Sequence, residues 1–165
     1  MEEIEKPSAE IQILTFLIGE EEYGVALTEV REIIEYTAAT KVPNSPYFIR
    51  GVINLRGSVV PVVDLAAKFG FDGLPVTKRT CIIIAEIEHE GKKILIGMIV
   101  DRVNQVLEIL PADIEAAPSF GAPVRNDYIR GLAKREKSFI LILALEKVLS
   151  YGELRPDLPI APGAK

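Results

Sequence analysis

Two stretches of this 165-residue chain repeat one spacing of glycine and apolar residues, and that repeat restricts the folds available to it. In each stretch a glycine, Gly24 or Gly97, precedes three apolar residues, and valine or isoleucine follows six and nine positions after the glycine. Further along, Gly51 and Gly131 each lead through one apolar run and a turn into another. A repeat of about 75 residues, with strands too short for a sandwich, predicts two small antiparallel barrels packed against each other.

The local patterns predict a mainly β protein with short helices. Apolar runs bounded by turn residues predict strands over residues 11–18, 23–27, 79–87, 94–100, 103–109, 128–133 and 138–144, with one further hairpin inside 51–65. Capping residues ahead of short apolar runs predict helices over residues 28–35, 45–51, 64–70, 111–114 and 146–151. The helix at 28–35 depends on Val30, Ile33 and Ile34, whose i, i+3, i+4 spacing would place them on one helix face.

The length allows one compact domain or two small fused barrels, and it is too short for two ordinary domains. The stretch at 71–78 contains Gly73 and Pro75 and is the best internal linker. We therefore predict an N-terminal extension, a folded domain with two approximate subdomains, and a flexible proline-rich tail, at residues 1–9, 10–152 (10–75 and 76–152) and 153–165.

Charge and hydropathy exclude several classes of partner. The 19 lysines and arginines are scattered among 24 aspartates and glutamates, for a formal charge of −5, so no basic stripe could follow a nucleic acid backbone. No apolar run approaches the roughly 20 residues needed to cross a bilayer, so we expect no direct membrane insertion. The acidic N-terminus lacks the features of a secretory signal, and the single cysteine fits a reducing cytoplasm.

Candidate catalytic groups are few. Cys81 lies in an apolar run, where a structural thiol is expected, and His89 falls in a polar turn, where a solvated side chain is expected. Asp64 could be a phosphoacceptor at a strand end, but the companion acidic pair and lysine of a receiver site are missing, and a helix cap explains it. We predict no catalytic residue, no bound metal and no cofactor.

The turn around Arg56 is the sharpest candidate for recognition. Arg56 could bond the turn carbonyls or pair with Glu32, or it could meet the carboxylate of a partner, and these roles are compatible. The corresponding turn in the second half holds Lys134, Arg135 and Lys137 at looser spacing, so Arg56 with Glu32 is a feature of the first half alone. Gly51 and Gly131 could be helix terminators or bulges, and Val103 and Val106 could be core or could border an apolar groove suited to a helix.

These same segments are where the chain resembles the CheW-like family of chemotaxis coupling proteins. The likeness covers about residues 10–152, and it is carried by residues 22–25, 30–33, 46–57, 61–65, 97–103 and 128–132. The Asn-Leu-Arg-Gly block at 54–57 is the most specific of these motifs. The resemblance implies two five-stranded SH3-like barrels and no enzymatic activity.

It also implies partners and sites. Proteins of this family join the regulatory domain of the histidine kinase CheA to the cytoplasmic tips of methyl-accepting chemotaxis receptors, in arrays at the inner face of the membrane. Carried over by position, the kinase-binding set is Val30, Glu32, Ile33, Asn54, Arg56 and Gly57. The set that lines or shapes a receptor groove is Gly51, Gly97, Val103, Val106 and Gly131. The same domain occurs in CheA and CheV fused to other modules, but this sequence shows no receiver, phosphotransfer or ATPase segment, so a stand-alone adaptor is favoured. The alternatives are a CheW-like domain that serves another chemosensory output, or a phosphoacceptor or small-ligand-binding barrel.

Overall fold

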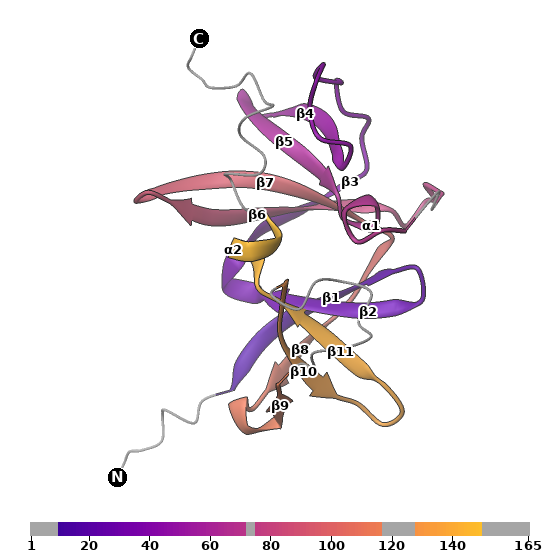
Figure 1. The fold of residues 1–165 in the computed structure, drawn as a ribbon, viewed down its shortest axis with the longest axis vertical. Coiled ribbons are helices and arrows are strands. Elements are labelled where there is room, and N and C mark those ends of the chain that lie inside the picture. Colours follow the sequence, from indigo (N-terminus) through magenta and orange to yellow (C-terminus); the bar gives the residue numbers. More distant parts are fainter. Residues whose placement is uncertain (1–9, 72–74, 117–127, 150–165) are drawn as a thin grey trace.

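The computed structural model describes residues 10–71, 75–116 and 128–149, and its strands form two sheets (Figure 1). Sheet A has six strands in the order β8 (Arg102–Ile109), β1 (Ile11–Ile18), β2 (Glu21–Ala26), β11 (Phe139–Leu143), β10 (Ile129–Lys134) and β9 (Ile114–Glu115). Sheet B has five in the order β3 (Val30–Glu35), β6 (Cys81–His89), β7 (Lys92–Val100), β5 (Ser58–Asp64) and β4 (Ile49–Leu55). The mainly β fold is confirmed.

Each sheet curls so that the chain leaving one edge strand reaches the other edge strand. In sheet B the segment after β3 bridges to β4 through two hydrogen bonds between Thr40 and Val52, at 2.8 and 2.9 Å. In sheet A the segment after β8 forms the 3-10 turn η3 (Pro111–Asp113) and then β9, which pairs with β10. Each curled sheet encloses its own apolar cluster, which centres on Ile13, Ala133, Ile140 and Ile142 in sheet A and on Ile53, Val60, Ile82 and Ile84 in sheet B.

The two halves of the chain exchange strands. Residues 30–100 provide every strand of sheet B, whereas sheet A combines β1 and β2 with β8 to β11. The chain crosses between the sheets at the 3-10 turn η2 (Leu27–Glu29) and at Asp101. The predicted subdomains 10–75 and 76–152 therefore do not coincide with the sheets, because each half lends its first hairpin to the other. The repeat remains visible in the pairing, since Gly24 of β2 faces Ile142 and Gly97 of β7 faces Val62.

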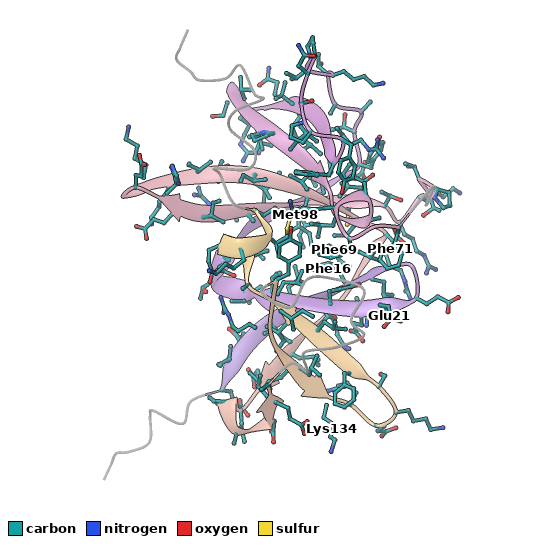
Figure 2. The ribbon with its side chains drawn as sticks, viewed as in Figure 1. Phe16, Glu21, Phe69, Phe71, Met98 and Lys134 are labelled. Carbon is teal, nitrogen blue, oxygen red and sulfur yellow. The ribbon has the colours of Figure 1, made fainter. Side chains whose placement is uncertain are left out.

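A third and larger apolar cluster fills the space between the sheets. We call it the shared core, and it includes Leu14, Phe16, Tyr23, Ile83, Ala85, Met98, Leu143 and Leu145. Figure 2 shows Phe16, Phe69 and Met98 where the two sheets face each other. The rings of Phe16 and Tyr23 stack with centroids 6.1 Å apart, and Tyr23 contacts Phe69 at 5.4 Å. Because each barrel alone is small, this common cluster supplies burial that neither would have by itself.

The predicted helix at 28–35 is wrong, because residues 30–35 form β3. The strand contains a β-bulge: Val30 faces Ala85 and Glu32 faces Ile84, so Arg31 is an extra residue without an opposite partner. An extra residue shifts the alternation by one, so Val30 and Ile33 share a face of the strand as they would share a face of a helix. The i, i+3 spacing in the sequence came from this bulge.

The other short helices follow the sequence more closely. Helix α1 (Leu65–Lys68) is capped as predicted, because the amide of Ala67 donates to Asp64 Oδ1 at 3.2 Å. The predicted turn near 111–114 is η3, and the closing helix α2 (Leu145–Val148) begins one residue before its predicted start. The helix predicted at 45–51 is only a turn, with the amide of Ile49 donating to the carbonyl of Pro46 at 3.0 Å. Residues 1–9, 72–74 and 150–165, on which the predicted extension, part of the linker and the tail fall, lie outside the described residues.

Candidate partner-binding surface

The turn between β4 and β5 displays Arg56 in an unusual backbone conformation. Arg56 and Gly57 are the two loop residues of a hairpin in which Leu55 faces Ser58, and both have positive φ angles, 51° and 91°. Two-residue hairpins of type I′ require this conformation at both positions, and only glycine adopts it without cost. Asn54 Oδ1, on β4, accepts a hydrogen bond from the Gly57 amide at 2.7 Å, and this bond stabilises the turn. Because arginine carries a Cβ, holding Arg56 in this conformation costs the turn some stability relative to glycine.

Arg56 and Glu32 join the two edges of sheet B. Arg56 Nη2 lies 2.7 Å from Glu32 Oε1, and the two side chains are 70% and 30% exposed. The hydrogen bond from Arg56 lowers the pKa of Glu32 below its ordinary value. Because this bond uses one nitrogen of a guanidinium that carries five N–H groups, the exposed side chain still has donors for a carboxylate of a partner. Both expected roles of Arg56 are thus compatible with one geometry.

The other members of the predicted kinase-binding set lie on the same sheet. Val30 is half-buried against the shared core, and Ile33 is 44% exposed. Asn54 sits on β4 opposite Val59, which is 62% exposed and was absent from the prediction. The sequence could have indicated Val59, because side chains alternate between the two faces of a strand and one of the neighbouring residues Val59 and Val60 therefore points outward. Kinase binding by this set remains a prediction.

The glycines of the predicted receptor set are sites of close approach within the chain. A Cβ on Gly51 would lie 2.0 Å from the carbonyl oxygen of Thr40, one on Gly97 would lie 2.8 Å from Ile82 Cγ2, and one on Gly131 would lie 2.4 Å from Ile114 Cγ2. Gly51 lies inside β4 and Gly131 inside β10, each at a register shift, so both are bulge residues and neither terminates a helix. These glycines could shape a surface but do not line an open one.

The valines of the receptor set lie together on β8. Val103 is half-buried against the shared core and faces Phe16, whereas Val106 is 50% exposed and faces Leu14. Both therefore border the junction between the sheets, and Val106 is the member of this set that a partner could contact directly. Receptor binding at this edge remains a prediction.

A carboxylate-lined cavity of about 500 Å³ lies beside η2. Glu29, Glu86, Glu88, Glu146 and Lys93 contribute to its lining. Glu29 Oε1 is buried and accepts no hydrogen bond from the described part of the chain. Burial raises the pKa of Glu29, Arg130 opposes that rise, and the nearby charge of Glu146 adds to it.

We expect Glu29→Gln to stabilise the protein at neutral pH. The raised pKa means that the native state binds this proton more readily than the unfolded chain, so stability falls as pH rises from the ordinary glutamate range through the native pKa. The amide has no charge to desolvate, so the free energy of unfolding at pH 7 should rise modestly, because partial exposure screens the charge, and this gain should vanish near pH 4. Urea denaturation at both pH values measures it. Glu88→Gln, at an exposed position on the same cavity, is the control, and an equal gain in both variants would contradict the explanation.

The candidate catalytic groups have structural partners. Asp64, besides capping α1, accepts a hydrogen bond from Arg50 Nε at 2.9 Å. His89 Nε2 lies 3.7 Å from the exposed carboxylate of Glu90, and burial raises the pKa of Cys81. Within residues 10–71, 75–116 and 128–149 no three metal-ligating side chains gather, and no helix there is long and apolar enough to span a membrane.

Comparison with known proteins gives a consistent result. Residues 12–153 match the family model of the CheW-like domain. Chemotaxis protein CheW of Klebsiella aerogenes is 35% identical over 143 residues, which cover 87% of this chain and 84% of that protein, and the probable chemotaxis protein CheW of Rhizobium etli is 34% identical over 86% and 89%. The crystal structure of the scaffolding protein TtCheW from Thermoanaerobacter tengcongensis superposes with a TM-score of 0.77 at 35% identity, covering 87% of this chain and 95% of that one. The chain therefore belongs to the CheW-like family.

Proposed function

We propose that this protein is a non-catalytic chemotaxis adaptor that couples methyl-accepting chemoreceptors to the histidine kinase CheA in cytoplasmic signalling arrays. The observation that carries the proposal is the exposed ion pair between Arg56 and Glu32 in a chain of the CheW-like family. The turn that presents Arg56 is fixed by the hydrogen bond between Asn54 and Gly57. Relatives named chemotaxis protein CheW and a structural neighbour described as a scaffolding protein support it. The mechanism is one of differential contacts: the adaptor holds kinase and receptor in one geometry, so that a receptor movement changes the kinase.

Reconstitution of the three proteins tests the proposal. Receptor cytoplasmic fragments on vesicles and CheA should co-sediment in an amount that depends on this protein, and receptor control of CheA autophosphorylation should depend on it too. The protein itself should gain no phosphate from ATP or acetyl phosphate. Stable phosphorylation of Asp64, or kinase control that does not need this protein, would contradict an adaptor role.

The exposed valine on β8 gives a sharper test of the receptor edge. Val106→Asp places a charge where a helix of the receptor would bury the side chain, so receptor affinity should fall by about tenfold or more while CheA affinity stays within about twofold. The half-exposure of Val106 makes a large loss of stability unexpected. Titration of fluorescent protein with each partner measures both affinities. A larger loss for CheA than for the receptor would show that the two predicted faces are interchanged.

A further inference from the structure

Two β-bulges occupy equivalent places in the repeat. On β3 the extra residue is Arg31, as described above. On β8 the pairing passes from Phe16 with Val103 to Thr15 with Gln105, so Asn104 is the extra residue. Each bulge therefore lies inside an apolar pair with a spacing of three, Val30 with Ile33 on β3 and Val103 with Val106 on β8. Residues three apart on a regular strand point to opposite faces, and one extra residue between them returns them to the same face.

The pairing of β8 with β1 shows which face of the sheet these valines share. Val103 faces Phe16 and Val106 faces Leu14, and both of these partners are buried in the shared core. Val103 packs against that core, and Val106 extends the same apolar face to the surface. Without the bulge the exposed valine would point to the other side of sheet A, because a shift of one residue inverts the faces of a strand. The position of Val106 thus depends on the bulge at Asn104.

A single carboxylate holds this bulge from two strands away. Glu22 lies on β2, Asn104 lies on β8, and β1 separates the two strands. Glu22 Oε2 accepts from Asn104 Nδ2 at 2.8 Å and from Gln105 Nε2 at 3.3 Å. Although partial burial acts to raise it, the pKa of Glu22 is lowered by hydrogen bonds from Thr15, Asn104 and Gln105. The charged form of Glu22 therefore binds the extra residue and its neighbour together.

The equivalent bulge on β3 is held in a related way. Arg31 Nη1 lies 2.6 Å from Glu86 Oε1 on the paired strand β6, and Lys93 Nζ lies 3.5 Å from the other oxygen of Glu86. In both bulges the side chain of the extra residue is thus bound by a glutamate of the hairpin that its strand joins. An ion pair holds the bulge on β3, and hydrogen bonds between a carboxylate and two carboxamides hold the bulge on β8.

We propose that Glu22 is a positioning residue for receptor recognition: by binding the bulge residue Asn104 it fixes the register of β8 and so presents Val106 beside Val103. The inference rests on the proposed function, because it assigns a role at the receptor edge. Glu22 itself needs no contact with the receptor. Its effect is transmitted through the backbone of β8.

The test compares Glu22→Ala and Glu22→Gln in the full-length protein. Glu22→Ala should reduce affinity for a receptor cytoplasmic fragment by about tenfold, since charge-assisted hydrogen bonds at Asn104 are lost, and leave affinity for the CheA regulatory domain within about twofold. Methyl NMR should show shifted Val106 resonances, and amide exchange should accelerate over residues 103–107. Glu22→Gln keeps one acceptor oxygen and should lose affinity to an intermediate degree.

Two controls separate positioning from general stability. Glu21→Ala removes an exposed neighbouring carboxylate of the same strand and should change none of these readouts. Ile142→Val lowers stability from inside sheet A and should leave receptor affinity unchanged at temperatures well below unfolding. Unchanged Val106 resonances in Glu22→Ala, or an affinity loss matched by Ile142→Val, would overturn the proposal. If the unaltered protein fails to bind the receptor fragment, the proposed function is wrong. The comparison of Val106 resonances between the unaltered protein and Glu22→Ala would still show whether Glu22 fixes the register of β8.

Discussion

Arg56→Glu should abolish most of the binding to the CheA regulatory domain while leaving the fold intact. The substitution places a carboxylate beside that of Glu32 and opposite any acidic group of the partner, so affinity should fall by at least about tenfold. The melting temperature should change by less than about 3 °C, because the side chain is 70% exposed and glutamate meets the same backbone conformation as arginine. Isothermal titration with the CheA domain and a thermal melt measure the two quantities.

The hairpin between β6 and β7 provides a matched control. Glu90 and Gly91 occupy its two loop positions with φ angles of 52° and 79°, close to those of Arg56 and Gly57. Glu90→Lys therefore reverses a charge in the same kind of turn, and it should leave CheA binding unchanged. If Arg56→Glu also leaves binding unchanged, Arg56 is only a residue of its turn.

A charge exchange distinguishes two roles for the pair. The double variant Glu32→Arg with Arg56→Glu can form the ion pair again in the opposite orientation. If the pair serves only to fasten the edges of sheet B, the double variant should recover CheA binding. We expect no recovery, because the guanidinium on the turn is proposed to contact the partner.

Gly51→Ala should cause the largest loss of stability of any substitution considered. The added Cβ would lie 2.0 Å from the carbonyl oxygen of Thr40 and 3.1 Å from the Cα of Lys41. Both are backbone atoms, and the Thr40 oxygen also accepts the hydrogen bond from the Val52 amide in the bridge. The φ angle of 139° is unfavourable for alanine as well. We expect a loss of more than about 3 kcal/mol, measured by urea denaturation, with the closure of sheet B as the first structure to open.

Alanine substitutions at two other glycines distinguish the cost of the backbone conformation from the cost of the steric clash. Gly91→Ala has a positive φ but no described atom within 4 Å of the added carbon, so it should cost only about 1 kcal/mol. The Cβ added by Gly131→Ala would lie 2.4 Å from the side-chain atom Ile114 Cγ2, and the nearest backbone atom, the carbonyl oxygen of Glu115, would be 3.0 Å away. Its cost should therefore fall between the other two. Equal losses of stability at all three positions would contradict the explanation that the backbone of Thr40 lies too close to Gly51 for a Cβ.

Local chemistry explains why much of the fold could be predicted. The hairpins were visible because alternating apolar residues and turn residues fix strands over short distances, and Asp64 was recognisable as a cap because it precedes a short apolar helix. The segment at 30–35 was misread for an equally local reason, since a bulge gives a strand the residue spacing of a helix. No pattern within a few residues distinguishes the two.

The exchange of hairpins could not be predicted from the sequence. Because the halves are equivalent in pattern, β1 and β2 could pair with strands of either half without changing any local residue preference. The choice depends on the complete packing of the shared core. For the candidate site, the sequence predicted a role for Arg56 and Glu32, and the structure pairs them. The sequence could not show that Glu22 reaches across β1 to Asn104.

The exchange also sets an order of events as the chain is synthesised. The hairpin β1–β2 is synthesised before the strands that flank it in sheet A. Ile11 of β1 pairs with Ile109 of β8, and β11, the parallel neighbour of β2, begins only at Phe139. Residues 30–100, in contrast, contain every strand of sheet B and can pair as soon as they emerge. The first hairpin must therefore wait, with its apolar face uncovered, until nearly the whole domain has been made, and this interval is when the nascent protein is most exposed to aggregation.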